Sequence, residues 1–331
     1  MNQNSSGSIT LQQAISGFLQ AKEAEALRPR TIESYRHELD RWAQQLGTPL
    51  ASQVTAQDVR AYLVYLRTDY KPRRFNGQTN PLSPKTLRNA YITLASYFHW
   101  LNVEFGIANP MTQIPAPKYQ VVETEPFTQR EVETLLQACQ FKREAETRDR
   151  CRFVQHRPTA LRDRAIVLVL LDTGLRASEL CALDLGDLDQ RTGKVVVKAG
   201  DEGGAKGGKG RLVYLGKAAR RAVWRYVVTR EDGNDPLAPL FTVRFGRRMN
   251  KNALLQLIQG LGAAAQVKDC YPHRFRHTFA ITYLRSGGDI FTLQKLLGHS
   301  SLDMVKHYAK VAQIDVEQAH RRASPADNWR L

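Results

Sequence analysis

The stretch between Gly106 and Pro126 constrains the fold of this chain more than any other. It contains four prolines, Pro110, Pro115, Pro117 and Pro126, and no periodic apolar face. Because proline fixes φ and removes a hydrogen-bond donor, such a stretch is typical of an extended linker. A chain of 331 residues is long enough for two domains with separate cores. We therefore predict one domain at 8–105, a linker at 106–125 and a second domain at 126–331.

Apolar residues recur with a helical period through the first of these domains, which predicts four amphipathic helices. The recurring residues are Leu11, Ile15, Phe18 and Leu19, then Ile32, Tyr35, Leu39, Trp42 and Leu46, then Val59, Tyr62, Leu63 and Leu66, and finally Leu87, Tyr91, Leu94, Phe98 and Leu101. Thr55 and Asp58 have the spacing of a capping box for the third helix, and Ser83 followed by Pro84 begins the fourth. The pattern indicates an all-α domain of four helices.

The second domain is predicted to be α+β and mainly helical, with a small antiparallel sheet. Its first helix begins at the capping box Thr128-x-x-Glu131, and a later helix at 161–171 ends at the turn 172–174. Short strands are expected near 185–189, 194–198 and 211–215, with a glycine-rich hairpin tip at 200–210. The strongly polar segment 141–160 is expected to form an exposed extension of a helix or loop, and the sequence assigns it no role.

The charge of the chain points to a polyanionic partner. Its 48 Lys and Arg residues against 32 Asp and Glu give a net charge of +16, and the pI is near 9.9. Such an excess favours nucleic acid. No apolar run is long enough to span a membrane, and the polar first residues lack the apolar core of a signal peptide, so we expect a cytoplasmic protein without a membrane partner. The four cysteines lack zinc-site spacing and are expected to be reduced thiols.

Several residues in the second domain have the chemistry needed to attack a phosphodiester. They are Arg176 in T-G-L-R-A-S-E-L, His273 and Arg276 in H-R-F-R-H, His299 in L-G-H-S, and Tyr308. Arginine grips two phosphate oxygens and keeps its charge, whereas a tyrosine needs neighbouring cations or a base to become a nucleophile. A lysine on the hairpin tip could protonate the leaving oxygen.

Taken in order, these motifs resemble the tyrosine recombinase (phage integrase) family over residues 10–320. The resemblance implies a SAM-like, core-binding first domain that clamps DNA, and a catalytic second domain that uses neither a metal nor a cofactor. By the same resemblance Arg176 and Arg276 clamp the phosphate, and His273 shares in proton transfer and phosphate contact. His299 hydrogen-bonds the phosphate, and Tyr308 forms a 3′-phosphotyrosine. The family also places a lysine on the hairpin. Counting back from Arg211 favours Lys206 for this position, with Lys209 as the rival.

The resemblance implies site-specific recombination of double-stranded DNA by a homotetramer on two sites, with a dimer on each, through a Holliday junction. Integration and excision of a mobile element is the leading expectation, and a Xer-type dimer resolvase is the rival. A type IB topoisomerase is disfavoured by the small helical first domain. A non-catalytic DNA-binding regulator would not need Tyr308 and both arginines, so the presence of these residues argues against that function. Glu179 is expected to support Arg176, whereas Asp184 and Asp187 lack a third ligand for a metal site.

Overall fold

The computed structural model describes residues 9–47, 49–72, 79–120, 124–140, 145–147, 150–153, 157–199, 210–299, 301–312 and 324. The chain divides into two compact units, Met1–Val122 and Glu123–Leu331. Each unit has its own hydrophobic core, as two domains require. In the part of the chain that the structure describes, no helix is long and apolar enough to cross a membrane.

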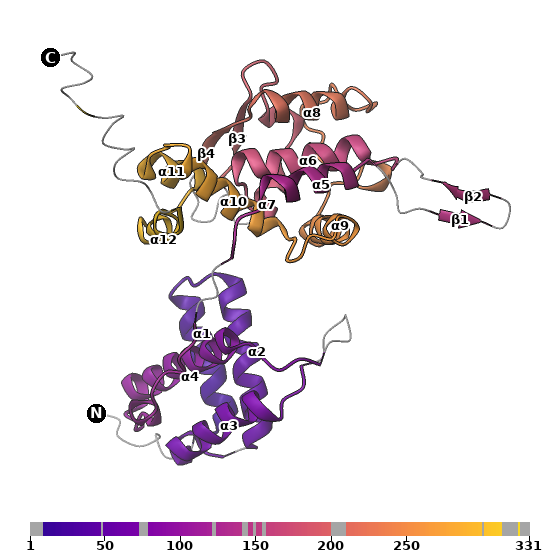
Figure 1. Ribbon diagram of the computed structural model, residues 1–331. Coiled ribbons are helices and arrows are strands. Elements are labelled where there is room, and N and C mark those ends of the chain that lie inside the picture. Colours follow the sequence, from indigo (N-terminus) through magenta and orange to yellow (C-terminus); the bar gives the residue numbers. More distant parts are fainter. Residues whose placement is uncertain are drawn as a thin grey trace. The chain divides into compact units, whose positions relative to one another are not determined.

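The first unit is helical (Figure 1). Its helices are α1 (Leu11–Ala24), α2 (Pro29–Leu46), α3 (Ala56–Thr68) and α4 (Pro84–Phe105), with short 3-10 turns at Ala51–Gln53 and Pro110–Gln113. The predicted caps are present, because the Thr55 hydroxyl accepts from the Asp58 N–H and the Ser83 hydroxyl accepts from the Thr86 N–H. The prediction of four helices in this part of the chain is confirmed.

Aromatic rings fill the centre of the first unit. Trp42 makes edge contacts with Tyr97 and Phe98, and Phe18 makes an edge contact with Tyr97. All four side chains are fully buried. These residues come from α1, α2 and α4, so their burial accounts for the helical period seen in the sequence.

Part of the segment predicted as a linker packs onto this core instead. Ile107, Met111 and Ile114 are buried in the same cluster as the helices. The Tyr91 hydroxyl donates to the carbonyl of Ile114, and the Asn109 side chain accepts from the Met111 N–H. The prolines stiffen this segment, but the apolar residues between them have enough buried area to hold it against the domain.

The second unit is mainly helical, with two short antiparallel strand pairs. Its elements are α5 (Gln129–Ala138), β1 (Ala145–Thr147), β2 (Arg150–Phe153), α6 (Ala160–Thr173), α7 (Ala177–Ala182), β3 (Lys194–Val197), β4 (Arg211–Tyr214), α8 (Lys217–Val227), α9 (Lys251–Ala264), α10 (Pro272–Arg285), α11 (Ile290–Leu297) and α12 (Asp303–Ala312), with 3-10 turns at Leu185–Asp187 and Arg244–Gly246. Strand β3 pairs with β4 in a register that joins Lys194 to Tyr214 and Val197 to Arg211.

Two local predictions for the second unit were wrong. The strand expected at 185–189 is a 3-10 turn over Leu185–Asp187, with only a single bridge from Leu188 to Val195. The polar segment 141–160 contains the pair β1–β2 in its described part, where a helix extension or loop was expected. The first segment has only five residues and the second is strongly polar, so neither has a hydrophobic period long enough to distinguish a turn from a strand.

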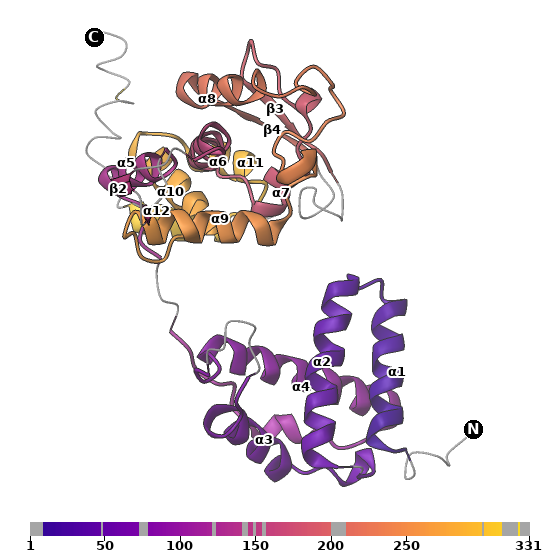
Figure 2. The same cartoon turned by 90° about the vertical axis from the view of Figure 1, so that its right-hand side faces the viewer.

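Helix α6 is the centre of the second unit. It packs against α8 and α10, and lies between them in both views (Figures 1 and 2). Ile166, Val167 and Leu170 are fully buried, so the helix is apolar on more than one side. The residues that follow its end, from Gly174 to Arg176, therefore start from a rigid support.

Removing a buried side chain from α2 should destabilise the protein. Leu39 is fully buried, and Leu39→Ala is expected to lower the free energy of unfolding by about 2–5 kcal/mol, because it leaves a cavity in the aromatic core. Val103 in α4 is 68% exposed, so Val103→Ala should change the value by less than about 0.5 kcal/mol. Urea unfolding followed by tryptophan fluorescence measures both. Equal effects of the two substitutions would contradict this description of the core.

Candidate active site

The turn after α6 brings Arg176 to the start of α7. Gly174 ends α6 with φ of 60°, and a Cβ there would lie 2.6 Å from the Phe279 ring, so only glycine fits. Arg176 is the N-cap residue of α7. Its backbone N–H and its Nη1 both donate to the carboxylate of Glu179, each at 2.8 Å. The Arg176 side chain is 22% exposed, so solvent and ligands can reach it.

Arg276 lies on α10 with its guanidinium buried beneath this turn. Nη1 donates to the carbonyl of Gly174 at 2.8 Å, and Nη2 donates to the carbonyl of Leu297 at 2.7 Å. These bonds join the ends of α6 and α11 to α10. Burial first, and the charge of Arg176 second, lower the pKa of Arg276 to about 10, so the group stays positive at neutral pH.

His299 follows α11 and contacts Arg276 directly. Gly298 ends α11 in the left-handed region, with φ of 64°, and turns the chain toward the site. The His299 Nε2 lies 2.7 Å from Arg276 Nη2. Because an arginine N–H only donates, Nε2 must accept, which places the proton of the neutral ring on Nδ1. Burial and the charge of Arg276 lower the pKa of His299 to about 4.

Tyr308 on α12 covers this cluster. Its ring stacks on His299 with centroids 6.2 Å apart, and meets His277 edge-on at 5.1 Å. The side chain is only 4% exposed and belongs to an apolar cluster with residues of α10 and α11. Burial raises the pKa of Tyr308, and the neighbouring Arg276 opposes that effect. The phenol is therefore protonated at neutral pH and lies beside a cation.

The structure brings together four of the six predicted residues, Arg176, Arg276, His299 and Tyr308. His273, one turn before Arg276 on α10, is exposed at the edge of this cluster, where it meets His277 edge-on at 5.1 Å and its charge contributes to the lowered pKa of His299. Lys206 and its rival Lys209 lie outside the described residues. The side chains that meet come from α7, α10, α12 and the end of α11, so the site depends on the packing of the whole second unit.

Arg211 is a residue of this site that the sequence analysis did not identify. It lies on β4, and its Nη1 and Nη2 donate to the Glu179 carboxylate at 2.9 and 2.7 Å. With both arginines bound, the pKa of Glu179 is lowered to about 2 although burial opposes this. Arg211 and Glu179 are 32 positions apart, so no local pattern in the sequence indicates the pair.

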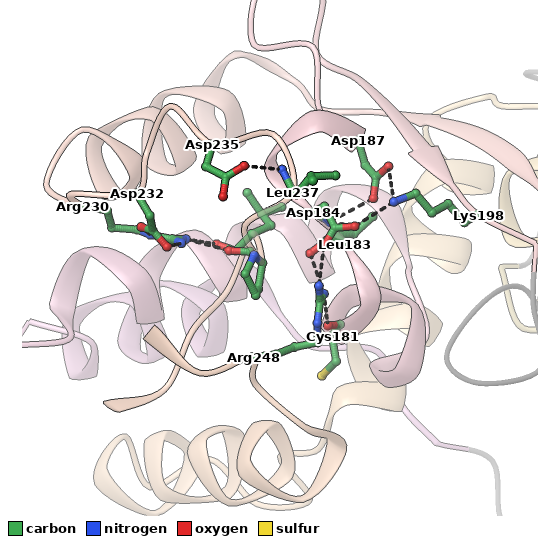
Figure 3. Close-up of polar contacts among 12 residues, drawn as sticks. Cys181, Leu183, Asp184, Asp187, Lys198, Arg230, Asp232, Asp235, Leu237 and Arg248 are labelled. Atoms are coloured by element: carbon green, nitrogen blue, oxygen red, sulfur yellow. Dashed lines mark hydrogen bonds and ion pairs between the residues drawn. The ribbon is translucent and has the colours of Figure 1, made fainter. Parts of the chain in front are cut away.

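Asp184 and Asp187 bind side-chain cations of the protein itself (Figure 3). Lys198 Nζ lies 2.7 Å from Asp184 and 3.0 Å from Asp187, and Arg248 also pairs with Asp184. Arg248 donates further to the carbonyls of Cys181 and Leu183 at the end of α7. Over the described residues, His, Cys, Asp and Glu form no group of three or more that could hold a metal ion.

The low pKa of His299 predicts how stability depends on pH. The folded value of about 4 lies below the ordinary 6.5, so between these values the unfolded chain binds a proton that the folded protein does not. This contribution to stability is therefore lost as the pH falls from about 6.5 toward about 4. His299→Gln removes it. The free energy of unfolding of the wild type minus that of the variant, from urea titrations, should decrease over this range, and a constant difference would contradict the prediction.

Both units match known protein families. Residues 15–104 match the N-terminal SAM-like domain of phage integrases, and residues 125–314 match the phage integrase family. The tyrosine recombinase XerC of Xanthomonas campestris pv. campestris is 30% identical over 302 residues, covering 89% of this chain and 83% of the relative. XerC of Pelobacter propionicus is 29% identical over 302 residues, covering 90% of each chain.

A solved structure supports the fold. The Tn1549 transposon integrase in complex with transposon right end DNA is similar with a TM-score of 0.69 and 20% identity, covering 91% of this chain and 94% of that one. The predicted fold class, an all-α SAM-like unit followed by a mainly helical catalytic unit with a small antiparallel sheet, is confirmed. The chain belongs to the phage integrase family, the tyrosine recombinases that break and rejoin DNA.

Proposed function

We propose that this protein is a site-specific recombinase in which Tyr308 attacks the scissile phosphate and forms a 3′-phosphotyrosine. The observation that carries the proposal is the contact of buried Arg276 with both His299 and Tyr308. Arg176 lies close enough to Arg276 to lower its pKa. A phenol beside two guanidinium groups has a nucleophile and the charge to bind a phosphate in one place.

Each predicted residue has a role in the proposed cleavage. Arg176 and Arg276 bind the non-bridging oxygens, and His299 hydrogen-bonds the same phosphate. The Tyr308 oxygen bonds to phosphorus as the bond to the 5′-oxygen breaks. His273 shares in transfer of the phenol proton and in contact with the phosphate. Lys206 protonates the leaving 5′-oxygen, which becomes a free 5′-hydroxyl.

The proposed assembly is a homotetramer on two double-stranded DNA sites, with a dimer on each site. Strands are exchanged in pairs through a Holliday junction. The net charge of +16 supports a DNA partner, because many phosphate contacts need many cations. A structure of similar fold has transposon DNA bound, which also supports this partner.

The leading biological role is integration and excision of a mobile element. The likeness in fold to a transposon integrase supports it. A Xer-type dimer resolvase is the second candidate, because two XerC relatives are similar over about nine-tenths of this chain. Sequencing the DNA that flanks the gene separates the two. Inverted core-type repeats with cargo genes support an integrase, and a lone chromosomal locus supports a resolvase.

Tyr308→Phe should abolish covalent attachment to DNA while DNA affinity stays within about threefold, because one hydroxyl contributes little to a long basic interface. A nicked suicide substrate traps the covalent complex, and a gel-shift titration gives the affinity. Tyr226→Phe is the control, since Tyr226 lies on α8 with its hydroxyl beside Thr242. Trapping of the Tyr308→Phe protein on DNA would disprove the assignment of the nucleophile.

Lys206→Ala should slow cleavage by about a hundredfold or more with little change in binding, because a general acid contributes about 10²–10⁴-fold. Lys209→Ala should weaken binding and keep the rate. A substrate with a 5′-bridging phosphorothiolate has a sulfur leaving group that needs no proton, so it should restore cleavage by Lys206→Ala. Rescue of Lys209→Ala alone would move the role to Lys209, and rescue of neither would remove the lysine from the mechanism.

A further inference from the structure

We infer that Arg211 is a positioning residue for DNA cleavage, an inference that rests on the proposed function. Arg211 holds two parts of the site, the Arg176 guanidinium and the turn that carries His299. Its own guanidinium is bound to the protein and does not reach the phosphate. The strand that leaves the 200–209 segment is thereby joined to the site where the phosphate binds.

The guanidinium of Arg211 is committed to bonds within the protein. Nη1 and Nη2 donate to Glu179, and Nε donates to the carbonyl of Leu296 at 2.6 Å. The side chain is 7% exposed, compared with 22% for Arg176. All three nitrogens thus have protein partners, so Arg176 is the better placed of the two to meet a ligand.

Arg211 holds the Arg176 guanidinium through the carboxylate of Glu179. Its Oε1 accepts from Nη1 of both Arg176 and Arg211, and its Oε2 accepts from Arg211 Nη2 and from the backbone N–H of Arg176. A carboxylate bound by two nitrogens of Arg211, and by Nη1 and the backbone N–H of Arg176, has little freedom to rotate. When Arg211 is removed, Glu179 keeps only the bonds to Arg176, and both groups can turn together.

Arg211 holds the turn that carries His299 through the end of α11. Arg211 binds the carbonyl of Leu296, and Arg276 binds the carbonyl of the next residue, Leu297. A Cβ on Gly298 would lie 3.1 Å from the Arg211 Cδ, so the turn before His299 packs closely on this side chain. Arg211 therefore fixes the path of the backbone between α11 and His299.

The position of Arg211 in the sheet extends this link to β3 and β4. Arg211 is the first residue of β4 and pairs with Val197, the last residue of β3. One residue, Gly210, separates it from the 200–209 segment that carries Lys206. A lysine at 211 could not replace the arginine, because one ammonium cannot span two carboxylate oxygens and a carbonyl in the fixed geometry of a guanidinium.

Arg211→Met should slow covalent complex formation by about a hundredfold, since a misplacement of about 1 Å has effects of that size. The measurement is the single-turnover rate on a nicked suicide substrate with saturating full-length protein. DNA affinity should stay within about threefold, because no phosphate contact is lost. Arg211→Lys keeps the buried charge and should slow the reaction at least about tenfold. This second variant tests the inference if the methionine variant fails to fold.

Arg230 offers a matched control in the same unit (Figure 3). It too is a mostly buried arginine that binds one carboxylate with two nitrogens, Asp232 at 2.7 and 2.6 Å, and the carbonyls of Pro239 and Leu240. Arg230→Met and Arg230→Lys should lower the melting temperature as the Arg211 variants do, but leave the cleavage rate unchanged. An equal loss of rate in both pairs would mean that Arg211 is only a stabilising residue, and would overturn the inference.

A double-mutant cycle tests whether Arg211 acts through Arg176. In an Arg176→Lys background, Arg211→Met should cost less than about tenfold, because the group it positions is already altered. A different result is that the two substitutions lower the cleavage rate by independent factors that multiply, while DNA binding becomes weaker and less dependent on salt. Arg211 would then contact the phosphate directly, which would overturn the inference. Failure of the proposed function is a different result, in which the wild type forms no Tyr308-dependent covalent complex.

Discussion

The buried carboxylate of Glu179 is the interaction on which the catalytic unit depends. It is 1% exposed, and a carboxylate at such a position costs several kcal/mol unless it is fully paired. Here four hydrogen bonds from Arg176 and Arg211 compensate for that cost and keep the pKa near 2. Removing the carboxylate would leave two guanidinium groups near each other without a counter-charge. The same pairing therefore supports the fold and holds the Arg176 side chain in place.

The charge around Glu179 is not balanced within the described residues. Three guanidinium groups, those of Arg176, Arg211 and Arg276, lie around one carboxylate. The excess accounts in part for the low pKa of Arg276 and for that of His299, because each added cation disfavours a further positive charge. A bound phosphate would supply the missing negative charge. In the proposed function, the site would have its binding charge in place before DNA arrives.

The elements that could be predicted from the sequence are those whose apolar period or cap lies within one short stretch of the chain. The four helices of the first unit followed from apolar periods and caps, since the recurring residues, such as Leu39 and Trp42, are the ones that are buried. Segment 106–114 belongs to a proline-rich stretch typical of a linker, yet its apolar Met111 and Ile114 pack on the first core. The four site residues that meet were found through motifs. The Arg211–Glu179 pair was missed because it forms only when β4 packs near α7.

The motif T-G-L-R-A-S-E-L has a physical explanation at most of its polar positions. Thr173 donates its hydroxyl to the Val169 carbonyl and so closes the last turn of α6. Gly174 takes the left-handed conformation and turns its carbonyl to Arg276. Arg176 is the N-cap residue of α7, and the carboxylate of Glu179, three residues on, accepts from the Arg176 backbone N–H. The Arg176 guanidinium remains partly exposed. The letters that identify the family therefore mostly encode a tight turn between two helices, and this turn holds the Arg176 side chain in place.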